Sequence, residues 1–295
     1  MPPLSERISD LLGVQVTRTR DVGGQHGYRH VVGTLADGRP VFVKAASSAA
    51  DAAAFAAEAN GLRWLAAADG GPAVPQVLGV APDFLVIGLL APLERTTPEA
   101  ARRFGASLAR MHAAGAPSFG APWPGYIASL PLDNTALDNT APGQADWASW
   151  YAERRLLPYL RRAHDDGVLS RAEVSPVESV IGRIGELAGP PESPSRIHGD
   201  LWSGNVLWSG GRGWLIDPAA HGGHRETDLA MLALFGAPHL DEILHGYTDT
   251  APLADGWRSR VPLHQLHPLL VHVCLFGGGY TAQLAAAARA ALSSE

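Results

Sequence analysis

The hydrophobic pattern of this chain changes character once, near residue 90, and this change limits the folds available to it. Before that point, short apolar runs alternate with turn signals. The runs are residues 14–19, 28–35, 40–44, 76–80 and 84–89. The Asp37-Gly38 dipeptide between two of them is a strong hairpin signal. The first third of the chain therefore predicts a small antiparallel sheet.

Helical periodicity interrupts this sheet once and dominates after it. Residues 49–67 carry a set at helical spacing on one face: Phe55, Glu58, Leu62 and Leu65. Later helical segments, separated by Gly- and Pro-rich loops, are residues 98–114, 145–165, 171–187, 226–235, 240–247 and 262–292. We predict an α+β fold of two lobes: a small sheet lobe with one helix, residues 1–90, and a larger, mainly helical lobe, residues 91–295.

Charge and cysteine content exclude several classes of partner. The chain has 295 residues, a formal net charge of −6 and a pI near 6.0, so it has no excess of cations for nucleic acid or an anionic membrane. The single cysteine, Cys274, excludes an intrachain disulfide and fits a reducing compartment. No signal-peptide pattern begins the chain, and no apolar run reaches the roughly 18 residues of a membrane span. We expect a cytoplasmic protein and infer no obligate protein partner.

A short polar segment carries the clearest chemical signal. Asp200 and Asn205 lie five residues apart in the octapeptide HGDLWSGN, which begins at His198, and this is the spacing of the protein-kinase catalytic loop. Such a loop holds a carboxylate that accepts a hydroxyl proton beside an amide that ligates Mg²⁺. We predict Asp200 as the catalytic base and Asn205 as a metal ligand.

The following segment predicts a β-hairpin that ends in a second carboxylate. Two apolar runs, residues 206–208 and 214–216, flank a turn, and Asp217 follows them. There Asp217 can bind Mg²⁺ that bridges the β- and γ-phosphates. An ordinary surface hairpin is the alternative. Because base, amide and metal carboxylate recur in this order, we predict a phosphoryl-transfer site for ATP and Mg²⁺.

Upstream residues fit the nucleotide half of such a site. Lys44 ends a predicted strand, where a kinase-like sheet presents the lysine that holds the α- and β-phosphates, and Glu58 on the next helix is its natural partner. Gly23 and Gly24 could bring backbone amides close to phosphate, but a plain hairpin turn explains them about as well.

Three further positions are assigned by place or by chemistry alone. The backbone of residues 88–90, which are Gly88, Leu89 and Leu90, would hydrogen-bond adenine at the end of the last predicted strand. Asp228 begins an apolar helix, where it is either a helix cap or, in addition, the group that orders the loop carrying Asp200. We expect His198 to anchor that loop rather than to react.

These residues resemble the fructosamine kinase, or ketosamine 3-kinase, family, within the aminoglycoside-phosphotransferase and protein-kinase-like group. The most specific part is residues 198–208, with Trp202 after the Asp-Leu pair, followed by residues 216–219, 225–231 and 234–236. The resemblance implies ATP-dependent phosphorylation of a sugar hydroxyl on a ketosamine, either a small molecule or protein-bound. By position, it also implies Asp200 as the proton acceptor.

The substrate is the least constrained part of this interpretation. Trp202 offers a flat ring for a sugar to stack on, whereas Trp147 and Trp150 fit the core of the helical lobe by default. His221 and His224 stand where the family usually has an aromatic residue and a more acidic or polar neighbour. Both histidines are therefore candidate substrate contacts, and the preferred ketosamine stays open.

A kinase of the same fold that acts on an aminoglycoside, choline or a homoserine-like alcohol is the nearest alternative. A polycationic aminoglycoside would need a cleft lined with carboxylates, and several acids could serve: Asp133, Asp138, Asp146, Glu153, Asp165 and Asp166. Scattered acids on helices are usually solvated, however.

Two alternatives come from other classes of protein. A nucleotide-binding pseudokinase would have lost part of the transfer machinery, yet all of it is present: Lys44, Glu58, Asp200, Asn205 and Asp217. A metal-dependent hydrolase would use one of two histidine sets, which are His198, His221 and His224, or His264, His267 and His272. Neither set shows the helical i, i+4 pair with a nearby acid that zinc sites normally use.

Overall fold

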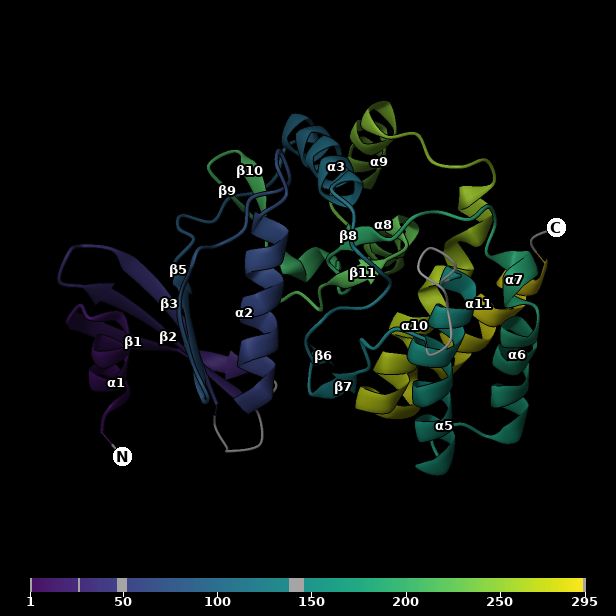
Figure 1. Cartoon of the computed structure of the whole chain (residues 1–295), viewed down its shortest axis with the longest axis horizontal. Coiled ribbons are helices and arrows are strands. Elements are labelled where there is room, and N and C mark those ends of the chain that lie inside the picture. Colours follow the sequence, from purple (N-terminus) through teal and green to yellow (C-terminus); the bar gives the residue numbers. More distant parts are fainter. Residues whose placement is uncertain (1, 26, 47–51, 138–145, 294–295) are drawn as a thin grey trace.

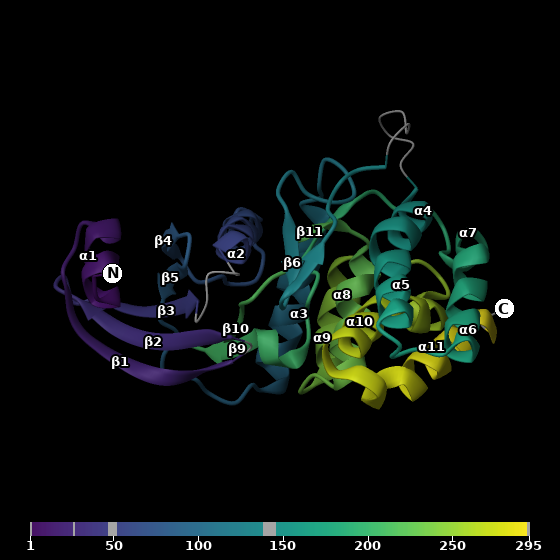
Figure 2. The ribbon, with the colours of Figure 1, turned by 90° about the horizontal axis from the view of Figure 1, so that it is seen from below.

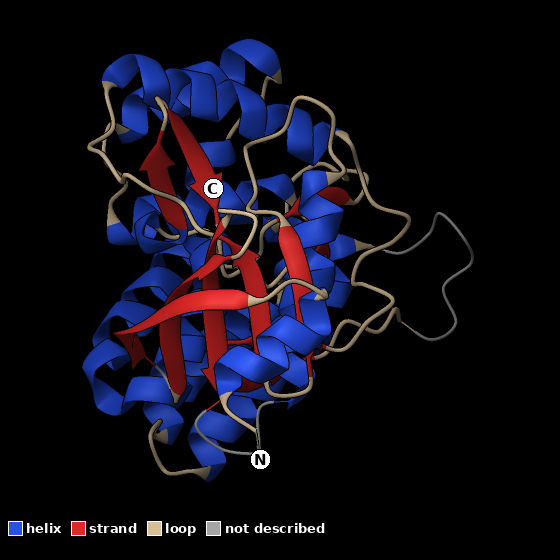
Figure 3. Ribbon diagram, turned by 90° about the vertical axis from the view of Figure 1, so that its left-hand side faces the viewer, coloured by secondary structure: helices blue, strands red, loops and turns tan. Residues whose placement is uncertain are grey.

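The computed structural model has a sheet lobe followed by a helical lobe (Figure 1). It describes residues 2–25, 27–46, 52–137 and 146–293. The sheet is antiparallel, with five strands in the order β1-β2-β3-β5-β4, and Figure 3 shows them side by side. The strands are β1 (Val16–Gln25), β2 (Tyr28–Leu35), β3 (Pro40–Ala46), β4 (Val77–Ala81) and β5 (Phe84–Gly88).

Alternation along β3 gives the sheet two apolar faces. Val41 and Val43 face outward and pack with Ile8 of α1 (Leu4–Leu12). Phe42 faces the other way, toward Phe55 of α2 (Ala52–Ala66). Figure 2 shows α1 and α2 on opposite sides of the sheet. The same alternation directs Lys44 to the inner face, which is turned toward the helical lobe.

The sheet lobe thus carries a second helix, α1, that the sequence analysis did not predict. Its signal is present in the sequence, because Leu4, Ile8 and Leu12 recur every four residues. Without α1 the outer face of the sheet would be left exposed, so this short helix completes the smaller lobe.

The predicted helices are found with shifted ends. They are α3 (Pro98–Ala113), α4 (Trp147–Tyr151), α5 (Leu157–Asp165), α6 (Arg171–Gly182), α7 (Ile184–Leu187), α8 (Arg225–Phe235), α9 (Leu240–Thr250), α10 (Trp257–Phe276) and α11 (Thr281–Ser293). A π-helical turn, η2 (Ala152–Leu156), joins α4 to α5 just before Pro158, whose nitrogen cannot donate a helical hydrogen bond. A 3-10 turn, η4 (Gly277–Tyr280), divides the last predicted helix.

Short strands also occur in the helical lobe. The predicted hairpin is confirmed as β9 (Val206–Ser209) and β10 (Arg212–Leu215). Four further strands pair in twos: β6 (Gly125–Ile127) with β7 (Leu130–Leu132), and β8 (Ser195–Ile197) with β11 (His221–Gly223). Each has three residues, too few for an alternating pattern to show in the sequence.

Two glycines let α3 and α9 approach closely. A Cβ atom on Gly105 would lie 1.9 Å from the carbonyl oxygen of Ile243, and one on Gly246 would lie 1.9 Å from that of Arg102. From this position α3 supports the β9–β10 hairpin, because Phe104 packs edge-on against Trp208. The close packing of α3 against α9 therefore fixes the position of the α3 surface that contacts the hairpin.

The two lobes share part of their hydrophobic core. The boundary near residue 90 therefore divides the chain into two segments, but side chains from both segments pack together across it. Leu65 at the end of α2 is buried with Phe104 and Leu108 of α3. Backbone hydrogen bonds also cross between the lobes, from Leu215 N–H to the carbonyl of Ala73. The boundary itself stays a prediction.

One stretch, Trp257–Ser293, is long and apolar enough to cross a membrane by length and composition alone. A core helix of a soluble protein passes the same test, and α10 contributes Leu266, Leu269 and Leu270 to the main core. The stretch is therefore weak support for a membrane span.

Candidate active site

A cleft of ≈ 470 Å³ lies between the sheet lobe and the helical lobe. The sheet lobe contributes Lys44 and Glu58 to its lining, and the helical lobe contributes Asp200, Asn205 and Asp217. The structure therefore brings together five side chains that the sequence predicts for phosphoryl transfer, although they come from distant segments of the chain.

Asp200 and Asn205 are held together by hydrogen bonds in the loop before β9. The amide nitrogen of Asn205 donates to the backbone carbonyl of Asp200 at 2.8 Å and to its carboxylate Oδ2 at 3.0 Å. Because the nitrogen makes these bonds, Oδ1 of Asn205 is the atom that can ligate a cation. Burial raises the pKa of Asp200 to about 7, against the opposing effect of Asn205. The carboxylate is thus prepared to accept a proton near neutral pH.

Lys44 joins the two lobes through an ion-pair triad. Its Nζ donates to both carboxylate oxygens of Glu58, at 2.9 and 2.8 Å, and to Oδ1 of Asp217 at 2.6 Å. Burial favours the neutral form of Lys44, but the two carboxylates outweigh this and raise its pKa. Desolvation by the cleft walls would also raise the pKa of Asp217, yet the Lys44 cation holds it below the usual range.

Asp217 follows β10 in a strained backbone conformation. Its φ of 52° lies in the left-handed region, which is uncommon for a residue with a side chain. The side chain is 46% exposed, so it faces the cleft instead of the core. Asn205 and Asp217 offer the oxygen ligands that Mg²⁺ prefers, and their side chains fit a metal site on this side of the cleft.

Asp228 orders the loop that carries Asp200. Its carboxylate, which is completely buried, accepts backbone N–H groups from His198 at 2.8 Å and from Gly199 at 2.9 Å. The cap of α8 is instead His224, whose ring accepts from Glu226 N–H. Of the two possibilities for Asp228, the contacts favour loop ordering over capping.

His198 ties the same loop to the hairpin. Its Nδ1 accepts the backbone N–H of Asp200 at 3.2 Å, and its Nε2 then donates to the carbonyl of Ile216 at 2.9 Å. Burial lowers the pKa of His198, which keeps the ring in this neutral form. His198 therefore links Asp200 to the residue before Asp217, as an anchor would.

Two residues missed by the sequence analysis support Asp228. His112 of α3 contacts its carboxylate through Nε2 at 3.1 Å, and Nδ1 of the same ring contacts the hydroxyl of Tyr247 in α9 at 2.8 Å. Neither residue lies near the motif in sequence, and a lone histidine or tyrosine on a helix reads as ordinary packing. Only the closeness of α3 and α9 reveals their connection to the loop.

The glycine segment does not reach the cleft as predicted. Gly23 and Gly24 lie within β1, which is longer than the sequence suggests because its pairing with β2 continues to Gln25. Neither glycine is among the residues that line the cleft. A Cβ on Gly24 would lie 2.1 Å from the Tyr28 carbonyl oxygen, so close strand approach explains this glycine. His26 of the segment lies outside the described residues.

The proposed adenine contacts line the cleft, but two of their donors are already used. The backbone N–H of Gly88 donates to Gln76, and that of Leu89 donates to Pro40. Neither amide can bind adenine without breaking a bond to its neighbouring strand. The amide of Leu90 is thus the better candidate for such a contact.

The three candidate substrate residues separate into one that faces the cleft and two that do not. Trp202 lines the cleft and is 39% exposed. His221 is buried beneath the loop with Nδ1 bonded to the carbonyl of Ala219, and His224 is buried against Trp147. The strand pairing of β11 with β8 turns His221 into the core, and His224 follows β11 as the N-terminal cap of α8. Trp123 and Tyr126, by contrast, line the cleft.

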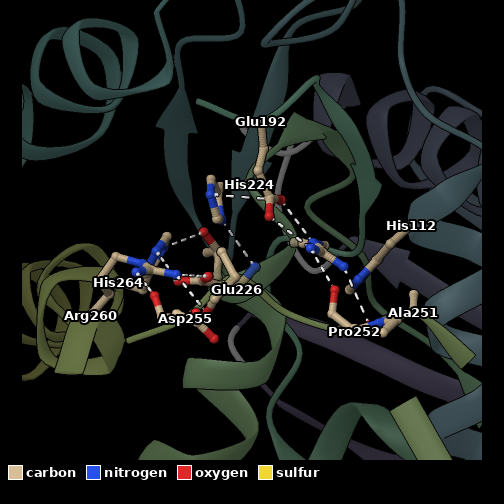
Figure 4. Close-up of polar contacts among 12 residues, drawn as sticks. His112, Glu192, His224, Glu226, Ala251, Pro252, Asp255, Arg260 and His264 are labelled. Carbon is tan, nitrogen blue, oxygen red and sulfur yellow. Dashed lines mark hydrogen bonds and ion pairs between the residues drawn. The ribbon is translucent and has the colours of Figure 1, made fainter. Parts of the chain in front are cut away.

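His224 belongs to a buried polar cluster on α8 and α10 (Figure 4). The carboxylate of Glu226 accepts hydrogen bonds from Arg260 at 2.9 and 2.6 Å, and Nε2 of His264 lies 3.3 Å from it without hydrogen-bond alignment. Burial would raise the pKa of Glu226, but His264 and Arg260 lower it to about 2.

The ligand atoms of His224, Glu226 and His264 lie within 4.8 Å of one another, close enough to surround a metal ion. Arg260 already occupies and neutralises the carboxylate, however, and a dication would be repelled by the guanidinium. Nδ1 of His224 also accepts a backbone N–H. We therefore interpret the cluster as an ion-pair network that fastens α8 to α10.

Buried neutral histidines make the fold sensitive to mild acid. Burial lowers the pKa of five histidine rings, which are His198, His221, His224, His264 and His267. For His221 the pKa falls to about 3. Below pH 6.5 the unfolded chain binds a proton on each ring while the folded chain does not, so the free energy of unfolding falls as the pH falls. We expect about 1.4 kcal/mol per pH unit for each ring that stays neutral.

Guanidinium unfolding at pH 7.5, 6.5 and 5.5 measures this slope. His267→Phe should reduce the slope by the share of one ring, because Nε2 of His267 has no hydrogen-bond partner and the ring packs edge-on against Tyr159. Asp200, whose pKa is raised, offsets about one ring in this range because the folded chain binds its proton first. A slope in His267→Phe equal to that of the wild type would contradict the assignment.

Comparison with known proteins identifies the family. The sequence model of the fructosamine kinase family matches residues 4–294. The chain belongs to the fructosamine kinase family. A Synechocystis protein described as a probable ketoamine kinase is 31% identical over 293 residues, covering 95% of this chain and 92% of the relative. The structure of a protein from Thermobifida fusca YX-ER1, described as a fructosamine-3-kinase, is 53% identical with a TM-score of 0.92 and covers 98% of both chains.

More distant structures show how widely the fold is shared. The aminoglycoside phosphotransferase APH(2″)-Ib, solved with ADP, has a TM-score of 0.61 at 14% identity and covers 98% of this chain and 96% of that one. These comparisons confirm the predicted two-lobe α+β kinase-like fold and the family resemblance. As a fructosamine kinase family member, the chain is a phosphotransferase, and the family implies ATP as the donor and a divalent metal ion.

Proposed function

We propose that this protein phosphorylates a sugar hydroxyl of ketosamines, such as fructosyl or ribulosyl amines, with Mg-ATP. The observation that carries the proposal is the meeting of Asp200 and Asn205 with Lys44 and Asp217 in one cleft. Together with the family, this arrangement supports an enzyme that acts on glycated amines, either free or bound to protein. The single cysteine fits a cytoplasmic location for it.

Catalysis in this site would rest on positioning and electrostatics. Lys44, oriented by Glu58, would hold the α- and β-phosphates. Asn205 and Asp217 would hold Mg²⁺, which when bound offsets the charge on the β- and γ-phosphates. Asp200 would orient the acceptor hydroxyl and take its proton as the new oxygen–phosphorus bond forms.

Nζ of Lys44 donates to Oδ1 of Asp217 at 2.6 Å, so the lysine occupies the place at this carboxylate that a metal ion would take. When Mg-ATP binds, we expect Mg²⁺ to replace Lys44 at the Asp217 carboxylate. Lys44 would then bind the phosphates and keep its ion pair with Glu58. The support for this exchange is that Glu58 makes two hydrogen bonds to the lysine and would retain its position.

The cleft suits a sugar of low charge better than a polycation. Its carboxylates are Glu58, Asp200 and Asp217, all used by the transfer machinery. Trp202, Trp123 and Tyr126 supply aromatic surface on which sugar rings stack. Of the acids that could attract an aminoglycoside, the five that the structure describes do not line the cleft. Asp133 faces Arg154, Asp146 caps α4, and Asp138 lies outside the described residues.

A product-mass screen tests the proposed function. The protein and Mg-ATP are incubated separately with fructosyl-lysine, ribulosyl-lysine, kanamycin and choline. We expect a mass gain of one phosphoryl group on at least one ketosamine and none on kanamycin or choline. Phosphorylation of kanamycin but of neither ketosamine would overturn the substrate class while leaving phosphoryl transfer intact.

A further inference from the structure

A continuous row of aromatic rings leads from the cleft onto the surface of the helical lobe. Trp202 meets Phe235 at 6.4 Å between ring centroids, and Phe235 meets His272 at 4.9 Å. His272 then contacts Phe276 at 5.4 Å and Tyr280 at 4.9 Å. We call these five residues the aromatic row. Its first member is the tryptophan that lines the cleft.

The row is unusually exposed for apolar side chains. Among the residues that the structure describes, five large hydrophobic side chains are exposed: Leu11, Val22, Leu93, Trp202 and Phe276. Two of the five belong to the row, and Phe276 is 52% exposed. Scattered single residues need no explanation, whereas a row of contacting rings with exposed members at Trp202 and Phe276 is typical of a binding surface.

The glycines next to the row add no side chain to the surface around it. Gly278 and Gly279 have ordinary backbone angles, and a Cβ atom built on either would meet nothing within 4 Å. Neither packing nor backbone conformation therefore requires glycine at these two positions. A larger residue would fit there, but its side chain could lie over Phe276 and Tyr280. Gly277 differs, since its φ of 74° favours glycine.

The segments that carry the four members beyond Trp202 are also free of formal charge. Residues 229–240 and 261–288 contain no Asp, Glu, Lys or Arg. A ligand on this surface would be recognised by ring stacking and apolar contact and not by ion pairs. The occupant should therefore be an uncharged apolar or aromatic group that is connected to something held in the cleft.

We propose that the aromatic row binds the substituent carried by the amine of the acceptor and gives the enzyme a preference for apolar or aromatic amines. This inference rests on the proposed function. With the sugar hydroxyl at Asp200 and the sugar against Trp202, the amine end of the ketosamine can continue along Phe235 and His272 toward Phe276. The cleft then selects the sugar, and the row selects the amine.

Two matched ketosamines test the proposal, and they share fructose, the secondary amine and a pentamethylene chain on that amine. In one the chain ends in a benzyl group that can extend along the row to Phe276, and in the other it ends in a methyl group. We expect kcat/KM to be higher for the benzyl compound by about 5- to 12-fold, the upper part of the range that one aromatic contact supports. In Phe276→Ala this preference should fall to about twofold or less, with kcat/KM for the methyl compound and KM for ATP kept within about twofold.

Leu11→Ala is the matched control, because it removes a similarly exposed apolar side chain on α1, far from the row. It should keep the preference. Gly278→Gln gives a second route that removes nothing from the protein, since its side chain enters open space beside the rings. It should also lower the benzyl preference, and this variant decides the case if Phe276→Ala is unstable in thermal melts.

The possible outcomes separate the two proposals. Equal kcat/KM for the two ketosamines in the wild type, or a benzyl preference that survives in a folded variant, would overturn the role of the row while the kinase function stands. Turnover of neither ketosamine would overturn the proposed function, and the role of the row with it.

Discussion

Replacing Asp200 with Asn is expected to lower kcat by about 10²–10⁴-fold, the usual contribution of a general base, while leaving ATP binding intact. An amide in this place can still accept the hydrogen bond that Asn205 donates to Oδ2 at 3.0 Å. The loop should keep its shape, because His198 and Asp228 hold its backbone. What is lost is the group that accepts the proton of the acceptor hydroxyl.

Coupled assay of ADP formation with a ketosamine measures kcat, and calorimetric titration with Mg-ATP measures binding. Asp200→Ala should behave similarly but with a less ordered Asn205. Asp241→Asn is a suitable control, since it makes the same chemical change on an exposed position of α9. Near-normal turnover in Asp200→Asn would remove Asp200 from its catalytic role.

Replacing Asp217 with Asn should remove most of the affinity for nucleotide that depends on Mg²⁺. The substitution deletes the charge that attracts the metal and one of the two carboxylates around Lys44. Changes to groups that merely support a metal ligand already weaken metal binding by 10- to 100-fold, so we expect at least about 10- to 100-fold here. Because the side chain is 46% exposed, stability should change little.

The decisive comparison is titration with ATP in the presence and in the absence of Mg²⁺. In the wild type the metal should strengthen binding, and in Asp217→Asn the two titrations should become nearly equal. Because Lys44 then keeps only Glu58 as an ion-pair partner, metal-free ATP should still bind. An unchanged Mg-ATP titration in the variant would show that Asp217 does not hold the metal.

Local sequence signals predicted the parts of the site that depend on neighbours along the chain. The five-residue spacing of Asp200 and Asn205, and the hairpin that ends at Asp217, are set by turn chemistry and strand alternation within about twenty residues. The pairing of Lys44 with Glu58 follows from a strand end and a helical face. In each case the local pattern and the final fold agree.

Predictions that depended on packing between distant segments failed or stayed open. The placement of His221 depends on β11 pairing with β8, and three-residue strands leave no periodic signal. His224 is placed by ring contacts with Trp147 and His264, which lie on other helices. Gly23 and Gly24 resembled a loop because glycine is common in turns, yet pairing with β2 continues through them. The support of Asp228 by His112 requires α3 and α9 to lie close together, which Gly105 and Gly246 permit.

The sequence by itself determined the two-lobe class of the fold, the chemistry of the transfer site and the identity of its five main side chains. These features follow from the spacing of residues close together in the chain and from the period of the hydrophobic pattern. Both can be recognised without knowing which distant segment a residue contacts. Only the tertiary structure decided which candidate substrate residues reach the cleft, that Asp228 orders the loop, and that Trp202 begins a row of rings ending at Phe276. Burial and contact between distant segments depend on how helices and strands pack. The amino-acid sequence does not give the distances between residues that are far apart in the chain.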